Sequence, residues 1–146
     1  MRAFADRLIE ITERHAEKIS DQWSKAVRTN LRTPSFHSKP HNECIQQGMD
    51  FYKKLRDIFF SEKPYTEVYR FFSKYAEDRY LEGTPLKETI YALIMMRRHM
   101  WLYADFQAMF LTPLDQHKAI ESINKTIRIF DHGTYFVIQK YEEMSR

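Results

Sequence analysis

The sequence is poor in residues that break regular structure, with three glycines and five prolines among 146 residues. A sandwich or barrel of many short strands needs frequent tight turns, and these turns use residues that tolerate positive φ. The chain has too few glycines to form the many tight turns of such a fold, so we expect it to be all-α. A chain of this length usually forms one domain, so we expect residues 1–146 to be a single helical domain.

Cysteine and long apolar runs are also scarce. The one cysteine, Cys44, cannot form an internal disulfide, so the chain carries no sign of an oxidising compartment. The longest apolar run, Ile90–Met96, has seven residues, whereas a membrane span needs roughly 18. Asp6, Arg7 and Glu10 interrupt any apolar stretch of a signal peptide. We therefore expect a cytoplasmic protein with no membrane span.

No large surplus of charge exists either. The 23 basic and 20 acidic side chains give a net charge of +3, whereas a dedicated nucleic-acid binder carries a clustered basic surplus. A nucleic-acid partner is therefore not expected.

Aromatic residues are abundant: eleven Phe, nine Tyr and two Trp make up 15% of the chain, enough to fill a core or to line a pocket. Apolar residues that recur every three or four positions predict five main helices. The expected domain is either globin-like, as the resemblance described below implies, or similar to a four-helix bundle. The helices are expected at about 4–31, 42–60, 65–82, 85–110 and 113–143.

Particular residues indicate where these helices begin and bend. Gly83 suits the left-handed residue that ends many helices. In Thr84-Pro85 and again in Thr112-Pro113, the hydroxyl can cap a helix whose first residue is proline. Gly133 lies inside the last predicted helix and is expected to weaken or bend it.

The usual signs of catalysis and metal binding are missing from the sequence. His37 and His41 lie in a predicted loop with Pro40 between them, and no Cys/His or Glu-x-x-His spacing suits a metal. Cys44 begins a helix, where the dipole can lower a thiol pKa, but a lone cysteine beside apolar residues is commonly just buried. No phosphate loop or nucleophile elbow occurs. We expect neither an enzyme nor a metal site.

Arg97, Arg98 and His99 interrupt the most apolar helix, so at least one cation must lie near its buried face. An unpaired buried charge is costly, and an acidic partner from the preceding helix is expected. Two interpretations stay open, a structural ion pair between helices or an anion or ligand site at the centre of the bundle. The candidate partners are Glu77, Asp78 and Glu82.

One string of residues is recognisable, A-x-x-R-x-x-x-G-x-P-L over Ala76–Leu86, followed by Arg97 and then by the aromatic Trp101. It resembles the N-terminal sensory domain of the RsbR/RsbRD-type stressosome co-antagonists, a family also found ahead of some bacterial histidine kinases. The similarity extends from about Ile9 to Tyr141.

This resemblance implies a globin-like, haem-free helical domain that forms a homodimer and passes a signal through its last helix to an output domain or a separate signalling protein. The usual output domain does not follow, so the chain is either a stand-alone sensor or a fragment. Arg79 and Arg97 would fix the helix pair around Gly83. The candidate ligand-binding residues are Tyr75, Arg79, Arg97 and Trp101.

The leading hypothesis is thus a non-catalytic sensory domain without a cofactor. The alternative is a haem-binding globin-type sensor with His99 or His132 as axial ligand, since both lie on apolar helices. A small enzyme is a third hypothesis, and its best candidate group is Tyr103, Asp105 and His99.

Overall fold

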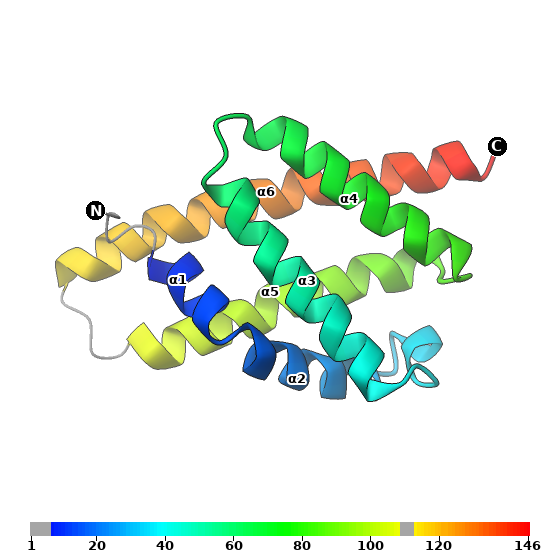
Figure 1. Cartoon of the computed structure of the whole chain (residues 1–146), viewed down its shortest axis with the longest axis horizontal. Coiled ribbons are helices and arrows are strands. Elements are labelled where there is room, and N and C mark those ends of the chain that lie inside the picture. The colour runs from blue at the N-terminus through cyan, green and yellow to red at the C-terminus, as the bar shows by residue number, and fades with distance from the viewer. Residues whose placement is uncertain (1–6, 109–112) are drawn as a thin grey trace.

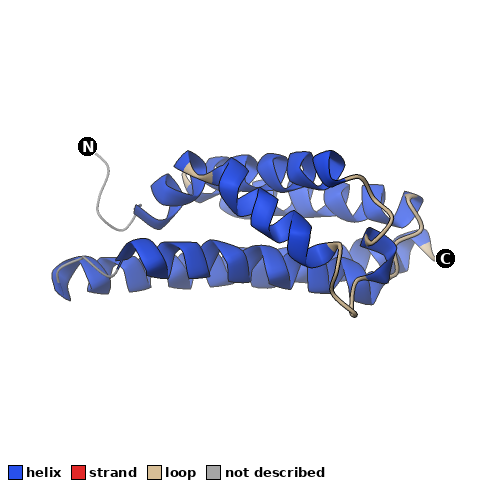
Figure 2. Cartoon of the chain, turned by 90° about the horizontal axis from the view of Figure 1, so that it is seen from below, coloured by secondary structure: helices blue, strands red, loops and turns tan. Residues whose placement is uncertain are grey.

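A computed structural model describes the backbone of residues 7–108 and 113–146, and the side chains of 9–103, 121 and 124–146. Its regular structure is entirely helical, with no strand among the described residues (Figure 2). The all-α prediction is confirmed. The helices are α1 (Arg7–Arg14), α2 (Ala16–Val27), the short 3₁₀ helix η2 (Pro34–Phe36), α3 (His41–Phe59), α4 (Pro64–Leu81), α5 (Leu86–Ala108) and α6 (Pro113–Met144).

The first predicted helix is two helices, α1 and α2, which meet at His15. The backbone there leaves the helical region, with φ −112° and ψ 22°, although the hydrogen bond from Ile19 N to His15 O bridges the bend. Both helices pack on α3 and α5, and α1 also packs on α6. The bend directs α1 toward α6, and this tertiary cause is invisible in the local periodicity.

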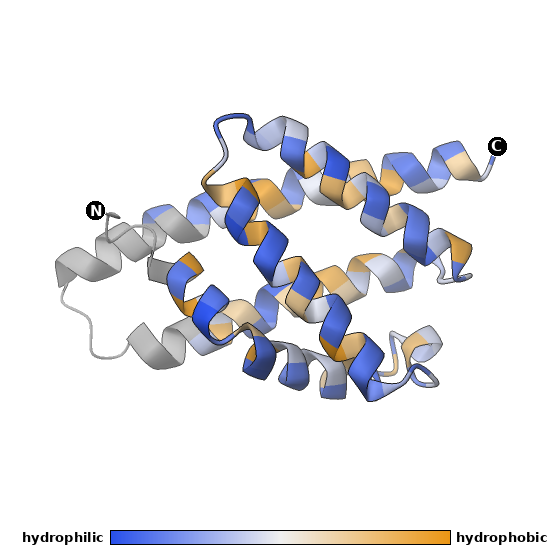
Figure 3. Ribbon diagram, viewed as in Figure 1, coloured by the Kyte–Doolittle hydropathy of each residue, from blue (hydrophilic) through white to orange (hydrophobic). Residues whose placement is uncertain are grey.

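The other helices lie close to their predicted ranges and form two crossing layers (Figure 1). α4 packs on α6 and crosses in front of it, and α3 crosses in front of α5. Hydrophobic residues recur between hydrophilic ones along each helix (Figure 3). Two buried hydrogen bonds fix α2 and α3 to α5: Trp23 Nε1 donates to Ala92 O at 3.0 Å, and the Tyr52 hydroxyl donates to Met96 O at 2.7 Å.

The aromatic core is centred on Phe51, which the sequence did not single out. Its ring contacts those of Phe71, Phe72, Tyr75 and Phe130. α3 is turned so that Phe51 is fully buried, whereas Met49 is only half-buried. The side chains of two further aromatic residues, Phe106 and Phe110, lie outside the described part of the chain.

Gly133 allows α4 and α6 to approach closely. A Cβ atom at this position would lie 2.5 Å from Cε1 of the buried Phe72 ring. α6 runs through this glycine without interruption. Gly133 therefore provides room for a ring between two helices.

None of the helices in the described part of the chain combines the length and the apolar character that crossing a membrane requires.

Candidate functional site

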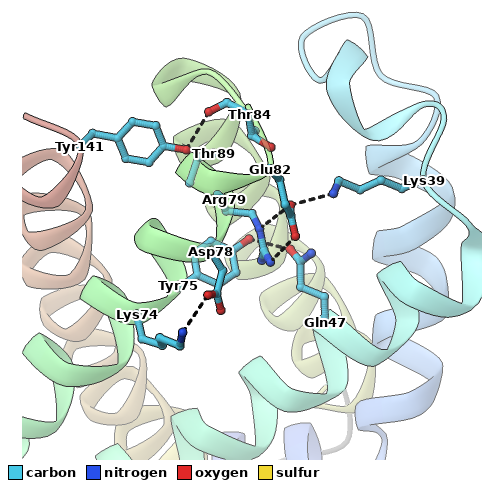
Figure 4. A network of polar contacts seen from close by, with 10 residues as sticks. All are labelled: Lys39, Gln47, Lys74, Tyr75, Asp78, Arg79, Glu82, Thr84, Thr89 and Tyr141. Carbon is cyan, nitrogen blue, oxygen red and sulfur yellow. Dashed lines mark hydrogen bonds and ion pairs between the residues drawn. The ribbon is translucent and has the colours of Figure 1, made fainter. Parts of the chain in front are cut away.

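The predicted residues Tyr75 and Arg79 meet near the C-terminal end of α4, in the network of Figure 4. Arg79 donates from Nε and Nη2 to the two carboxylate oxygens of Glu82, at 3.0 and 2.9 Å. Lys39, from the loop before α3, donates to the same carboxylate at 2.7 Å. Burial disfavours the charged carboxylate, but these hydrogen bonds outweigh burial and lower the pKa of Glu82. Glu82 therefore joins α4 to that loop.

Tyr75 lies between this ion pair and α3. The Arg79 guanidinium is 4.7 Å from the centre of its ring, and its hydroxyl donates to Gln47 Oε1 at 2.7 Å. Burial raises the pKa of Tyr75 to about 12, with Arg79 acting in the opposite direction. The phenol thus stays protonated at neutral pH and serves as a hydrogen-bond donor.

A hollow of about 360 Å³ opens beside these residues, between α3 and α4. Its size lies within the range of small-molecule sites, about 300–1,000 Å³. Phe51 and Phe71 supply apolar wall, while Tyr75 and Arg79 supply polar wall. Such a lining suits a small organic molecule with an apolar part and one or two polar groups. The remaining lining residues are Glu43, Gln46, Gln47, Asp50, Lys74 and Asp78.

Arg97 and Trp101, the other two candidates, form a separate pair that does not line this hollow. The Arg97 guanidinium lies 4.9 Å from the Trp101 ring centre and 5.9 Å from that of Phe130.

Of the two interpretations of the cations in α5, the ion pair with α4 is not found for Arg97: none of the ion pairs among the described residues joins the two. Asp78 binds Lys74, and Glu82 binds Arg79 and Lys39. Aromatic faces attract the Arg97 cation instead, through their quadrupoles.

Aromatic rings join the two arginine pairs. Phe51 lies 6.3 Å from Tyr75 and 5.5 Å from Phe130, measured between ring centres, and Phe130 in turn contacts Arg97. The four predicted residues therefore belong to one contiguous stack, of which only Tyr75 and Arg79 line the hollow.

The recognisable string forms the turn between α4 and α5. Gly83 adopts φ +83°, Gly83 N donates to Tyr80 O at 2.9 Å, and Thr84 N donates to Arg79 O at 3.0 Å. This pair of bonds is the Schellman arrangement that ends helices. α5 begins at Leu86, one residue later than predicted. Pro85 O accepts bonds from the N–H groups of Glu88 and Thr89.

The same turn holds the C-terminal end of α6. The Tyr141 hydroxyl donates to Thr84 O at 2.8 Å and lies 2.7 Å from Thr89 Oγ1. Because the single phenol proton goes to Thr84, the Thr89 hydroxyl is the donor in the second bond. Tyr80 adds a hydrogen bond from its hydroxyl to Met144 O at 3.0 Å. Arg79 is therefore linked to α6 through Thr84, whose N–H bonds to Arg79 O and whose carbonyl oxygen accepts the hydrogen bond from Tyr141.

A Ser–His–Asp arrangement that no sequence pattern indicated lies between α2 and α3. His41 Nδ1 lies 2.7 Å from Ser24 Oγ, and His41 Nε2 lies 2.9 Å from Asp21 Oδ1. The residues come from α2 and the first turn of α3, and Ser24 is fully buried. A nucleophile without access to solvent cannot reach a substrate, so this group ties α2 to α3. Cys44 is buried nearby, and its burial raises the thiol pKa, the opposite of activation.

The histidines proposed for haem lie apart from the α3–α4 hollow. His99 Nδ1 hydrogen-bonds to Met95 O at 2.9 Å, and the exposed His132 packs edge-on against Tyr65. In the alternative enzyme group, Tyr103 stacks on His15, and the Asp105 side chain lies outside the described residues. Within the part of the chain that is described, no cluster of three His, Cys, Asp or Glu side chains could hold a metal ion.

The chain matches a known protein family over nearly its full length. The model of the family described as "Histidine kinase N terminal" matches residues 5–143. No curated protein and no solved structure matches the chain.

Proposed function

The chain belongs to the histidine kinase N-terminal family, and from this membership we propose that it is a non-catalytic sensor that binds a small molecule between α3 and α4 and signals through α6. The family is one of sensory-type N-terminal domains. The observation that carries the proposal is the hollow beside Tyr75 and Arg79, whose helix end is bonded to Tyr141 and Met144 of α6.

A ligand can shift a domain between two states only if it binds one of them more tightly. The α3–α4 hollow can differ in ligand affinity between two states, because its two walls belong to separate helices whose spacing can change. Tyr75 bridges these walls through its hydrogen bond to Gln47. A ligand that changes the spacing of these helices displaces the end of α4. The bond from Tyr141 to the turn then passes this displacement to α6.

The finer relationship that we propose is with the RsbR-type stressosome sensors, in a globin-like, haem-free form. Such a domain works as a homodimer with an output domain or a separate signalling protein as its partner. Support for the dimer comes from α6, where Tyr135 is 61% and Ile138 is 37% exposed, three residues apart on one helical face.

The double variant Tyr135→Glu/Ile138→Glu tests this dimer. We expect light scattering after size exclusion to give about twice the chain mass of 17.8 kDa for the unaltered protein and a single chain mass for the variant. Two carboxylates in an apolar interface would have no partner. Leu31→Glu, at a position that is 92% exposed and away from α6, is the control and should stay dimeric. A monomeric unaltered protein would contradict the dimer.

A small aromatic amine, tyramine, is a suitable probe of sensing and relay. Its ring matches Phe51 and Phe71, and its ammonium group matches Asp50, one of three acidic residues that line the hollow. In a two-dimensional amide NMR titration we expect saturable shifts at Gln47 and Tyr75, and further shifts at the end of α6. In Tyr141→Phe, which removes the hydroxyl bound to Thr84, binding should remain while the α6 shifts shrink at least twofold.

Two outcomes would count against the proposal in different ways. Shifts confined to α3 and α4 in the unaltered protein would exclude the relay but retain the binding site. Saturable shifts elsewhere, with none at Gln47 or Tyr75, would exclude the site itself. Gln46→Trp, which places a large ring on the rim of the hollow, should abolish binding, and Gln46→Ala is its matched control.

A further inference from the structure

A second hollow, of about 210 Å³, lies between the start of α4 and the middle of α6. α6 contributes Lys125, Arg128 and His132, whose three- and four-residue spacings place them on one helical face. α4 contributes Tyr65 and Val68. No lining residue is shared with the α3–α4 hollow, and none is acidic. Basic groups and an apolar wall thus face one small space.

Two of the basic side chains that line this hollow, Lys125 and His132, contact neutral partners. Lys125 Nζ donates to Phe59 O at 2.8 Å and lies 4.3 Å from the centre of the Phe59 ring. That bond uses one of the three ammonium protons. His132 is likewise positioned by a ring, with its centre 4.8 Å from that of Tyr65. Like charges three residues apart on a helix, such as those of Lys125 and Arg128, repel each other, so an anion between them would stabilise this face.

The size of the hollow and the positive electrostatic potential around it also suit a small anion. α4 begins at Pro64, which lines the hollow, and a helix N-terminus carries partial positive charge. A guanidinium such as that of Arg128 binds oxyanions through two parallel hydrogen bonds. The volume lies below the range of about 300–1,000 Å³ for drug-sized ligands, which favours a compact group.

We propose that the hollow between α4 and α6 binds a small oxyanion of the phosphate class, held by Lys125, Arg128 and His132. Tyr65 and Val68 form the wall on which an apolar substituent of a phosphate monoester would lie. This site lies outside the sensor site proposed above and does not depend on it. The anion would bind to α6, the helix through which we propose that the domain signals.

Amide NMR titration with inorganic phosphate at constant ionic strength tests this site. We expect saturable shifts at Tyr65 and Ile129, because both residues line the hollow. Arg128→Gln should weaken binding at least tenfold. Arg128→Lys, which keeps the charge but loses the two parallel N–H donors of the guanidinium, should weaken it less. Arg98→Gln is the matched control, since Arg98 is an exposed cation of α5 that does not line the hollow.

The proposal has three ways to fail in this experiment. Equal shifts with chloride at the same ionic strength would show general screening of charge. Undiminished binding in Arg128→Gln, or an equal loss in Arg98→Gln, would show that the hollow is not the site. The absence of saturable shifts at Tyr65 and Ile129 would also overturn it. Phenyl phosphate binding at least threefold more tightly than inorganic phosphate would support the role of the Tyr65 wall.

Discussion

Gly133→Ala is expected to destabilise the protein by about 2–3 kcal/mol, because overpacking a well-filled core costs about 1–3 kcal/mol, occasionally more. The added Cβ would lie 2.5–2.6 Å from three atoms of the Phe72 ring. Phe72 is fully buried and contacts the rings of Phe51, Phe71 and Phe130, so it cannot move aside alone. Reversible urea unfolding followed by circular dichroism measures the difference.

The opposite sign is expected from helix propensity alone, which favours alanine over glycine by about 1 kcal/mol inside a helix. The experiment therefore separates the two effects. A matched test is the pair Phe72→Leu and Phe72→Leu/Gly133→Ala: with a smaller side chain opposite, the alanine should cost much less than it does beside phenylalanine. If the urea concentration at the unfolding midpoint were unaltered or raised in Gly133→Ala, this would contradict the close approach of α4 and α6 at this residue.

Gly133 also shows what the sequence can and cannot predict. Helix ranges follow from apolar periodicity and from local signals such as Gly83, which does adopt the expected positive φ. The reason for a glycine inside a helix lies in another helix, here the ring of Phe72. The bend at His15 has the same kind of cause, since α1 packs on α6 in addition to α3 and α5, which both helices contact.

The candidate site was predicted in part, for similar reasons. Tyr75 and Arg79 lie one turn apart, so their proximity follows from helical spacing. An ion pair between a cation of α5 and an acidic residue of α4 was one of two interpretations. Aromatic rings can also stabilise a cation, and Trp101 and Phe130 do so for Arg97. The contribution of Lys39 depends on the path of a long loop, which periodicity does not describe.

Arg79→Met is the most informative change in the candidate site, and we expect it to lower stability by about 2 kcal/mol. Removing one partner of a buried ion pair costs about 3–5 kcal/mol, and the estimate is reduced because Glu82 is 31% exposed and keeps Lys39. Lys74→Met is the matched control: its ion pair with Asp78 lies on the same helix but is mostly exposed, and such pairs contribute about 0–1 kcal/mol.

The pH dependence gives this prediction a second readout. The folded state lowers the pKa of Glu82, so the stabilisation is present above the unfolded pKa, about 4.5, and is lost as the pH falls through the lower folded value. Arg79→Met removes two of the hydrogen bonds that lower this pKa, so its stability should fall less steeply on acidification than that of Lys74→Met. Equal midpoints and equal acid slopes in the two variants would show that the buried pair stabilises the domain no more than a surface pair. In that case the end of α4 would be held by Tyr141 and the Gly83 turn, and Arg79 would be free to serve a ligand in the adjoining hollow.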